Sequence, residues 1–352
     1  MLLLLSVVGN HKDKLAAPKN QAAWLTKPGT PLQVSAAPLP KPSPSELVVK
    51  NAAVAINPLD SHVQDIGVFI QQWPAIFGCD VAGEVYEVGA DVQRFNKGDR
   101  VIGGHPQDGA YALYTVVPAN KAAILPDAIS FTDGVVVPFA VETAVCVLSL
   151  KEPGVAIPGV FTPALGLPAV LGQNSHRVRR LVFRRLHDDP ASDGSWTAAG
   201  IHISIVGAHN FDFSRRCGAA QVFDHKDPSL VNKIIEAVGT SGHEFIGIFD
   251  AIATPNTYAH DLEILAKLGG GHLACVHPPP ADVPANVKAG MIFAVNDIAT
   301  PVWKDYVTPA LEAGKIQCLP PPTVVGKGLE YIQEALKKSK AGVSATKLVV
   351  EL

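Results

Sequence analysis

Few side chains in this sequence could do acid–base chemistry at a site that the chain pattern itself suggests. His62 lies in a loop that begins at Asn57 and Pro58, and an imidazole there could donate a proton near neutral pH. The alternative is an exposed loop histidine without a catalytic role. Asp60, in the same loop, is better suited to stabilising a turn than to catalysis. This loop therefore gives one proton-donor hypothesis, His62.

The cysteines do not form a metal or disulfide framework. The five are scattered, odd in number and never spaced as Cys-X-X-Cys. This usage favours buried thiols in a reducing compartment, and so a cytoplasmic protein. Cys79, which has no neighbouring histidine, is more typical of a small buried apolar residue than of a zinc ligand. The sequence thus predicts chemistry without a metal.

Length and composition favour a folded, enzyme-like protein. The chain has 352 residues, enough for two domains, with 47% hydrophobic residues and a formal net charge of −3. This balance does not suggest nucleic-acid binding. The apolar segment Leu2–Val8 is too short to cross a bilayer. We therefore expect no membrane partner.

The positions of these residues depend on two contrasting halves of the chain. From Ala22 to Pro126 short strands alternate with glycine and proline turns, as in a β-barrel. Phe131–Leu150 is predicted to be a helix, and from Ile201 strands alternate with helices, which is typical of a parallel doubly wound sheet. After Thr300 we expect two more helices and a final strand, Thr346–Glu351.

A glycine-rich stretch, Ile76–Gly89, is followed by a second short strand ending at Ile102. Taken alone, this pattern would fit any small antiparallel barrel. The order of residues in this stretch, however, resembles the signature sequence of the medium-chain dehydrogenase/reductase superfamily. Four further segments match in the expected order: Ala52–Asp60, Gly109–Tyr114, Phe223–His225 and Ala345–Val349. The chain looks most like the zinc-free, fungal-type trans-acting enoyl reductases and their quinone-reductase-like relatives.

The resemblance implies an α/β fold with two domains. A GroES-like β-barrel domain would comprise residues 19–150 and 301–352, and a Rossmann-type domain residues 151–300. Residues 1–18 would be an added tail. Zinc-dependent relatives have a cysteine where this chain has Asn57, and a His-Glu pair where it has Cys79-Asp80.

The resemblance also implies site residues. Thr143 matches a position that hydrogen-bonds the nicotinamide, and His62 falls where relatives often have lysine. The predicted catalytic residues are therefore His62 and Thr143. The predicted cofactor-binding residues are Asn57, Pro58, Thr143, Gly207, Ala208, His209, Asn210, His225, Leu268, Gly269, Ser344 and Lys347. The predicted substrate-cleft residues are Val141, Glu142, Cys146, Cys275 and His277.

The end of the predicted second strand of the nucleotide domain favours NADPH over NADH. An NAD enzyme would place an acidic side chain after Val206 to hold the ribose 2′-hydroxyl, and none is present between Gly207 and Asn210. By resemblance, these residues line the 2′-phosphate pocket. His225 stands where the family commonly has tyrosine.

The phosphate-binding loop that should open the nucleotide domain is missing. Between Gly172 and Gly194 there is no glycine, and five of the nine arginines lie between Arg177 and Arg185. Unpaired arginines make a buried first strand too costly to desolvate there. The loss could prevent cofactor binding.

Translation of the codons for this stretch in a reading frame shifted by one nucleotide offers an explanation. Codon degeneracy then permits a β-strand, a Gly-Gly-Ser-Ser-Ser-Val-Gly loop and an amphipathic helix. Arg179-Arg180 and Arg184-Arg185 supply glycines in that frame, and Trp196 followed by Thr197 forces another. We interpret residues 172–196 as an out-of-frame or misassigned-intron segment. The alternative is a genuine insertion with a basic surface loop.

The sequence therefore predicts an NADPH-dependent, zinc-independent reductase of an activated C=C bond, in an enoyl thioester or an enone or quinone. The expected setting is fungal-type secondary metabolism, with a small-molecule or carrier-bound substrate, a possible polyketide synthase partner, and a monomeric or homodimeric protein. The rival hypothesis is a non-catalytic scaffold or binding protein that has lost its phosphate loop. A more remote hypothesis is nucleic-acid binding through the arginine cluster.

Overall fold

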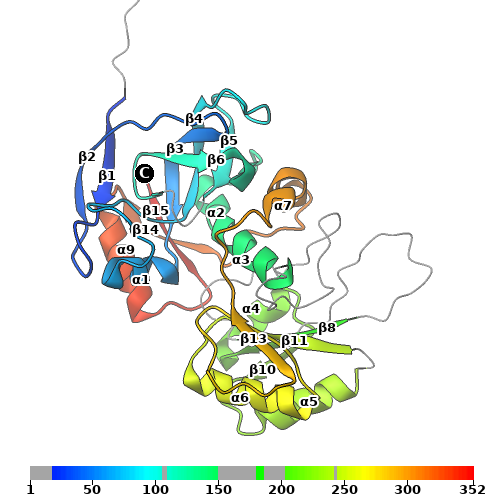
Figure 1. Cartoon of the computed structure of the whole chain (residues 1–352). Helices are drawn as coiled ribbons and strands as arrows, with labels where there is room; N and C mark the ends of the chain where they lie inside the picture. The colour runs from blue at the N-terminus through cyan, green and yellow to red at the C-terminus, as the bar shows by residue number, and fades with distance from the viewer. Residues whose placement is uncertain (1–17, 105–108, 150–179, 186–202, 242–243) are drawn as a thin grey trace, which may run out of the picture.

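The computed structural model describes residues 18–104, 109–149, 180–185, 203–241 and 244–352, arranged as two lobes joined by one helix and by residues 292–299 (Figure 1). One lobe is a β-barrel and the other a sheet with helices packed against it. The joining helix, α3 (Pro138–Ser149), lies between them. This arrangement confirms the predicted fold class, an α/β protein with a GroES-like and a Rossmann-like part.

The barrel lobe is built from both ends of the chain. Its larger sheet has the order β14-β15-β3-β4-β5-β7, with β6 also paired to β3. The C-terminal strand β15 runs antiparallel to β3, with Val349 opposite Ala55. The strands of this lobe are β1 (Asn20–Trp24), β2 (Gln33–Ala37), β3 (Glu46–Ala55), β4 (Asp80–Val88), β5 (Arg100–Gly103), β6 (Tyr114–Pro118), β7 (Ala122–Ile124), β14 (Pro322–Lys327) and β15 (Lys347–Glu351).

Local signals set the helices around the barrel. In α1 (Pro58–Ile66), Asn57 is the N-cap, Pro58 occupies the first turn, and Gly67 ends the helix at φ +70°. The predicted helix Phe131–Leu150 divides into α2 (Phe131–Gly134) and α3, because Pro138 lacks the N–H needed to continue a helix; Leu150 lies outside the described residues. After residue 299 the described chain has three helices, not the two expected: α7 (Thr300–Asp305), α8 (Val307–Glu312) and α9 (Tyr331–Ala341).

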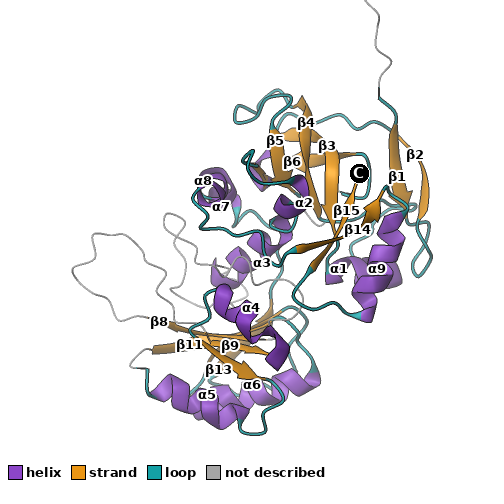
Figure 2. Ribbon diagram, turned by 180° about the vertical axis from the view of Figure 1, so that it is seen from behind, coloured by secondary structure: helices purple, strands orange, loops and turns teal. Residues whose placement is uncertain are grey.

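The second lobe is a six-stranded sheet in the order β10-β9-β8-β11-β12-β13. Five strands run parallel, and α5 and α6 pack against one face (Figure 2). The strands are β8 (Arg180–Arg185), β9 (Ile203–Val206), β10 (Gln221–Asp224), β11 (Glu244–Asp250), β12 (Gly271–Cys275) and β13 (Val287–Met291). The helices are α4 (Phe211–Arg216), α5 (Leu230–Gly239) and α6 (Pro255–Lys267).

Strand β8 lies in the segment where we predicted no buried first strand. The sequence reasoning anticipated no strand at this place, yet Arg180–Arg185 pairs with both β9 and β11. The prediction considered only the side chains. Between β9 and β11, however, the backbone N–H and C=O groups that face each other also need hydrogen-bond partners, and β8 supplies them. The remainder of this segment lies outside the described residues.

The direction of β8 differs from that of a first Rossmann strand. It runs antiparallel to its neighbours, so its first residue, Arg180, pairs with the last residue of β11, Asp250. A Rossmann phosphate loop follows the end of a strand at the carboxyl edge of the parallel sheet. β8 instead begins at the carboxyl edge and ends at the opposite edge. A loop that follows β8 therefore starts on the wrong side of the sheet for a phosphate loop.

The hydrophobic core is continuous from one lobe to the other. One buried cluster combines Ile102 of the barrel, Val141 of α3, Phe249 of the sheet and Trp303 of α7. Among the described residues, no helix is both long and apolar enough to cross a membrane.

Candidate functional site

A pocket of about 330 Å³ lies between the two lobes. Its walls come from α1, α3 and the carboxyl ends of β11, β12 and β13, where open parallel sheets bind ligands. The lining residues are Pro58, Leu59, His62, Phe69, Phe139, Thr143, Phe249, Ala251, Ile252, Val276, His277, Met291, Ile292, Phe293, Ala294 and Val295. The set is apolar and aromatic, with Thr143 and the two histidines as its polar side chains.

Thr143 presents an oriented hydroxyl to this pocket. Its Oγ1 donates a hydrogen bond to the Phe139 carbonyl oxygen, one helical turn earlier, at 2.9 Å. The hydroxyl proton is therefore engaged within α3. Toward the pocket, Oγ1 can accept a hydrogen bond from a ligand N–H group.

The two histidines come from different lobes. His62 on α1 and His277 after β12 have ring centroids 5.4 Å apart in an edge-to-face arrangement. Partial burial, followed by the nearby His62, lowers the pKa of His277. His277 is thus favoured as a neutral imidazole close to His62.

An aromatic pair at the pocket was missed by the sequence analysis. The Phe69 and Phe293 rings lie 5.5 Å apart, and their residues are 38% and 41% exposed. Phe69 has φ +69°, a left-handed conformation that is uncommon for a bulky residue. The sequence signal was a short apolar run, Val68–Ile70, which did not reveal that Phe69 has a partner in the segment after β13.

A buried polar centre supports the starts of α1 and α3. Asn57 Nδ2 donates to Asp80 Oδ2 at 2.9 Å, and Lys347 Nζ lies 3.1 Å from the same oxygen. Lys347 Nζ also donates to Asn57 Oδ1. The other Asp80 oxygen accepts from the Phe139 backbone N–H at 2.7 Å. Lys347, expected at the cofactor, is thus 2% exposed and held by two protein partners.

Asp60 forms a second carboxylate centre beside the first. Its Oδ2 accepts hydrogen bonds from the Asn57 backbone N–H at 2.6 Å and from the Tyr111 hydroxyl at 2.8 Å. Burial raises the pKa of Asp60 to about 6. Gly78 makes room for Tyr111, because a Cβ there would lie 2.6 Å from the ring. Asp60 caps the turn that begins α1, in agreement with its expected structural role.

The donor set of this centre suits an ammonium better than a metal ion. Asn57 and Cys79-Asp80 occupy the positions that the resemblance assigns to zinc ligands. Cys79 Sγ lies 3.7 Å from Asp60 Oδ1, and Lys347 supplies a positive charge at Asp80. Within the described part of the chain, no group of three or more His, Cys, Asp and Glu side chains is placed to hold a metal.

The predicted nucleotide residues gather at the end of β9. His209 Nε2 lies 2.9 Å from Ser344 Oγ, and Asn210 Nδ2 donates to the same oxygen at 3.2 Å. His225 Nδ1 lies 3.1 Å from the Val206 carbonyl oxygen. A Cβ on Gly207 would lie 2.8 Å from the His209 ring and 3.7 Å from the His225 ring. Gly207, Ala208, His209, Asn210, His225 and Ser344 thus form one cluster.

Several predicted residues lie elsewhere. Leu268 and Gly269 precede β12, at the opposite edge of the sheet from this cluster. Val141 and Cys275 are fully buried, and burial raises the pKa of the Cys275 thiol to about 12. Glu142 and Cys146 are buried beside the pocket and are absent from its lining. Of the predicted substrate-cleft residues, only His277 lines the pocket.

Comparisons with known proteins agree with this architecture. Residues 43–127 match the alcohol dehydrogenase GroES-like domain family. The chain is 70% identical over 346 residues to Dehydrogenase orsE of Emericella nidulans, covering 95% of this chain and 99% of that protein. It is 31% identical over 348 residues to Trans-enoyl reductase himH of Aspergillus japonicus, covering 95% and 97% respectively.

Solved structures share the fold at lower identity. The mycobacterial protein Rv1454c, solved with NADPH, matches with a TM-score of 0.65 at 20% identity, covering 95% of this chain and 100% of that one. The CurK enoyl reductase matches with a TM-score of 0.67 at 15% identity, covering 95% and 99%. Together with the two-lobed architecture, the extensive identity to fungal relatives shows that the chain belongs to the medium-chain dehydrogenase/reductase superfamily.

Proposed function

We propose that this protein is an NADPH-dependent reductase of an activated C=C bond in an enoyl or enone substrate of fungal secondary metabolism. The observation that carries the proposal is the inter-lobe pocket, in which Thr143 and two histidines are the polar groups on otherwise apolar walls. Relatives named trans-enoyl reductases, himH and tndF, support the reaction class.

The residues fit the two ends of a dinucleotide. Thr143 Oγ1 is suited to accept a hydrogen bond from a nicotinamide carboxamide, because its own proton is engaged by Phe139. The cluster around Ser344 offers imidazole, amide and hydroxyl groups without an acidic residue between Gly207 and Asn210. These groups suit a 2′-phosphate, and the nearby Asp224 carboxylate is engaged by His225 Nδ1 at 3.2 Å.

When bound, NADPH supplies a hydride to one carbon of the double bond while a proton is added to the other. We assign the proton to His62, which faces the pocket and is exposed enough to be reprotonated from solvent. Neutral His277 can donate a hydrogen bond to the carbonyl that activates the bond. Zinc independence belongs to the same proposal, because Lys347 and Asn57 already engage Asp80.

The pocket further suggests a substrate whose reacting end is uncharged. Among the described residues, the pocket lining includes no Asp, Glu, Lys or Arg. A neutral aryl or alkyl enone, free or attached to a carrier at its far end, would match these walls. A polyketide synthase is the partner that such a carrier would imply.

One observation favours a rival function, a non-catalytic binding protein. The antiparallel direction of β8 removes the strand end that would lead into a phosphate loop. Titration of the protein with NADPH and NADH, followed by fluorescence, separates the two. Saturable binding that prefers NADPH supports the enzyme, whereas no binding of either supports the rival.

Activity assays then test the residue roles. We expect His62→Gln to lower kcat for a simple enone such as 2-cyclohexenone by about 100-fold or more, with little change in NADPH affinity. His260→Gln, on α6, is the matched control. An unchanged kcat in His62→Gln would remove His62 as proton donor. Full activity after exhaustive chelation, with no stoichiometric zinc by metal analysis, is expected for the same enzyme.

A further inference from the structure

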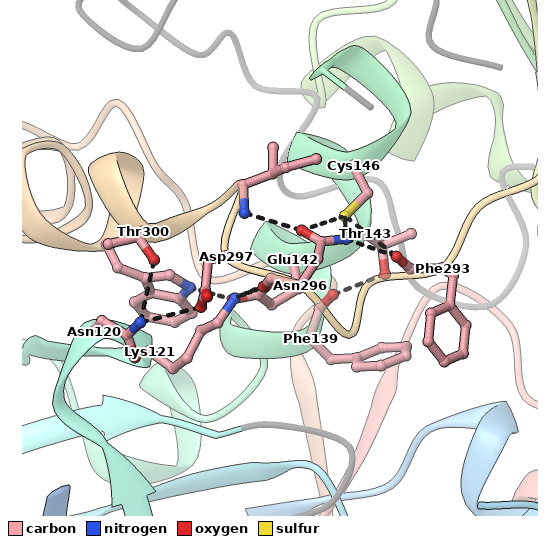
Figure 3. A network of polar contacts seen from close by, with 12 residues as sticks. Asn120, Lys121, Phe139, Glu142, Thr143, Cys146, Phe293, Asn296, Asp297 and Thr300 are labelled. Atoms are coloured by element: carbon pink, nitrogen blue, oxygen red, sulfur yellow. Dashed lines mark hydrogen bonds and ion pairs between the residues drawn. The ribbon is translucent and has the colours of Figure 1, made fainter. Parts of the chain in front are cut away.

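One wall of the pocket is a segment without helix or strand, residues 292–297, which follows β13. Phe293, Ala294 and Val295 from this segment face the pocket. Asn296 holds the segment in a turn: its Nδ2 donates to the Phe293 carbonyl oxygen at 2.7 Å, and its Oδ1 accepts from the Ile298 N–H at 2.9 Å (Figure 3). The shape of this wall therefore depends on what anchors Asn296.

The anchor is a buried ion pair. Lys121 Nζ donates to the Asn296 carbonyl oxygen and lies 3.0 Å from each carboxylate oxygen of Glu142 (Figure 3). The two side chains are 3% and 2% exposed. Glu142 also accepts a hydrogen bond from Trp303 Nε1 at 2.6 Å. Lys121, from the barrel lobe, thus ties α3 to a wall that belongs to the sheet lobe.

Helix α3 connects this anchor with the pocket. Residues four apart lie on the same side of a helix. Phe139 and Thr143 form a pair that lines the pocket, and the adjacent pair, Glu142 and Cys146, faces residues 293–296. The same helix therefore positions the predicted nicotinamide contact and, one residue away, the anchor of the opposite wall.

Stability alone gives a weak reason for such a pair. Two buried charges are costly to desolvate, and apolar side chains of similar volume often give equal stability. An apolar pair, however, could not donate to the Asn296 carbonyl oxygen. The specific contribution of Lys121 is therefore the tether to the pocket wall.

We propose that Lys121 and Glu142 are positioning residues that fix the 292–297 wall and thereby set the size of acceptor that the pocket admits. The inference rests on the proposed function, because it takes the pocket to be the acceptor site. Lys121 and Glu142 do not touch the substrate. They act through Asn296 and Phe293.

The test uses two neutral, redox-inert probes of different size, acetophenone and 2-acetonaphthone, titrated into the protein by calorimetry without NADPH. The variant Lys121→Met with Glu142→Gln removes the buried ion pair together with the tether to the Asn296 carbonyl oxygen, and it keeps an oxygen for Trp303. We expect the ratio of the two dissociation constants to change by about fivefold or more. The exposed pair on α9, altered as Lys338→Met with Glu334→Gln, is the matched control and should leave the ratio unchanged.

Asn296→Ala provides a second route to the same wall, because it removes the side-chain bonds to Phe293, Ile298 and the Cys146 thiol without changing any charge. It should shift the ratio as the double variant does. A ratio within twofold of wild type in a folded double variant, or in Asn296→Ala if the double variant does not fold, overturns the inference. Failure of the wild-type protein to bind either probe overturns it as well, whereas the NADPH titration decides the proposed function separately.

Discussion

The proposed acceptor end, at the inter-lobe pocket, and the proposed nucleotide end, at the carboxyl end of β9, differ in how completely their supports are built. At the acceptor end, the pocket walls rest on buried, mutually bonded groups, among them Asp80 with Lys347 and Glu142 with Lys121. At the nucleotide end, the place of the first Rossmann strand is taken by β8, which runs in the opposite direction. This difference indicates that the chain departs from the family pattern only locally, at the place of the first Rossmann strand.

A local departure fits our proposal that residues 172–196 are read in another frame. Gradual loss of function would relax constraints throughout the chain, including the costly buried charges of the acceptor end. Those charges remain paired. The identity of 70% to a fungal relative over 95% of the chain also argues against general drift.

The largest expected effect comes from restoring the nucleotide end. Replacing residues 172–196 by the 25 residues of the shifted frame should strengthen NADPH binding by about 1,000-fold, roughly 4 kcal/mol, because a glycine loop and a helix N-terminus would meet the diphosphate. Fluorescence titration measures the change.

A glycine–serine segment of equal length is the control, since it removes the arginines without building the loop. Equal NADPH affinity of the two replacements would contradict the frame proposal. Sequencing of the transcript through these codons gives an independent answer, and an uninterrupted arginine-coding stretch in the mature message would end it.

The next largest effect is expected from removing the buried cation that supports the acceptor end. Lys347→Met leaves the buried Asp80 carboxylate without its cation, and we expect a loss of about 3 kcal/mol or more in the free energy of unfolding. Denaturant unfolding measures it, with the exposed Lys338→Met as control, for which we expect no more than about 1 kcal/mol. Adding Asp80→Asn should recover part of the loss. Unchanged stability with weakened NADPH binding would instead make Lys347 a cofactor contact.

A smaller, pH-dependent effect on the free energy of unfolding is expected from the protonation of Asp60, beside the acceptor end. Because the pKa of Asp60 is raised to about 6, the folded state holds this proton more tightly than the unfolded chain. Its contribution to stability is present below about pH 4 and is lost as the pH rises through about 6. As the pH rises from about 4 to about 6, the free energy of unfolding of Asp60→Asn should therefore increase relative to that of the wild type by up to about 3 kcal/mol. Parallel stability profiles of the two proteins would show that Asp60 titrates normally.

The sequence predicted the lobes well because they depend on local signals. Strand alternation, the Pro58 and Gly67 limits of α1, and the spacing of strands and helices after residue 201 are all readable within short windows. The cluster of Gly207–Asn210 with Ser344 was also anticipated, through the resemblance of two distant motifs.

The missing parts of the site depend on partners distant in sequence. Glu142 was predicted to face the substrate cleft, whereas it is buried against Lys121, a partner that spacing could not identify. The pairing of Phe69 with Phe293 spans the two lobes and has no local signal. The pairing of β8 with β9 and β11 also had no local signal, since its arginines argued only against a buried first strand.

The burial of Lys347 in the last strand has a consequence for synthesis. Asp80 emerges from the ribosome with the early barrel strands, whereas its cation follows more than 200 residues later. At ordinary elongation rates the delay is on the order of tens of seconds. During that time the early strands carry an acidic residue without its counter-charge, so the barrel cannot close stably. We therefore expect the barrel to close only after the segment that carries Lys347 has emerged.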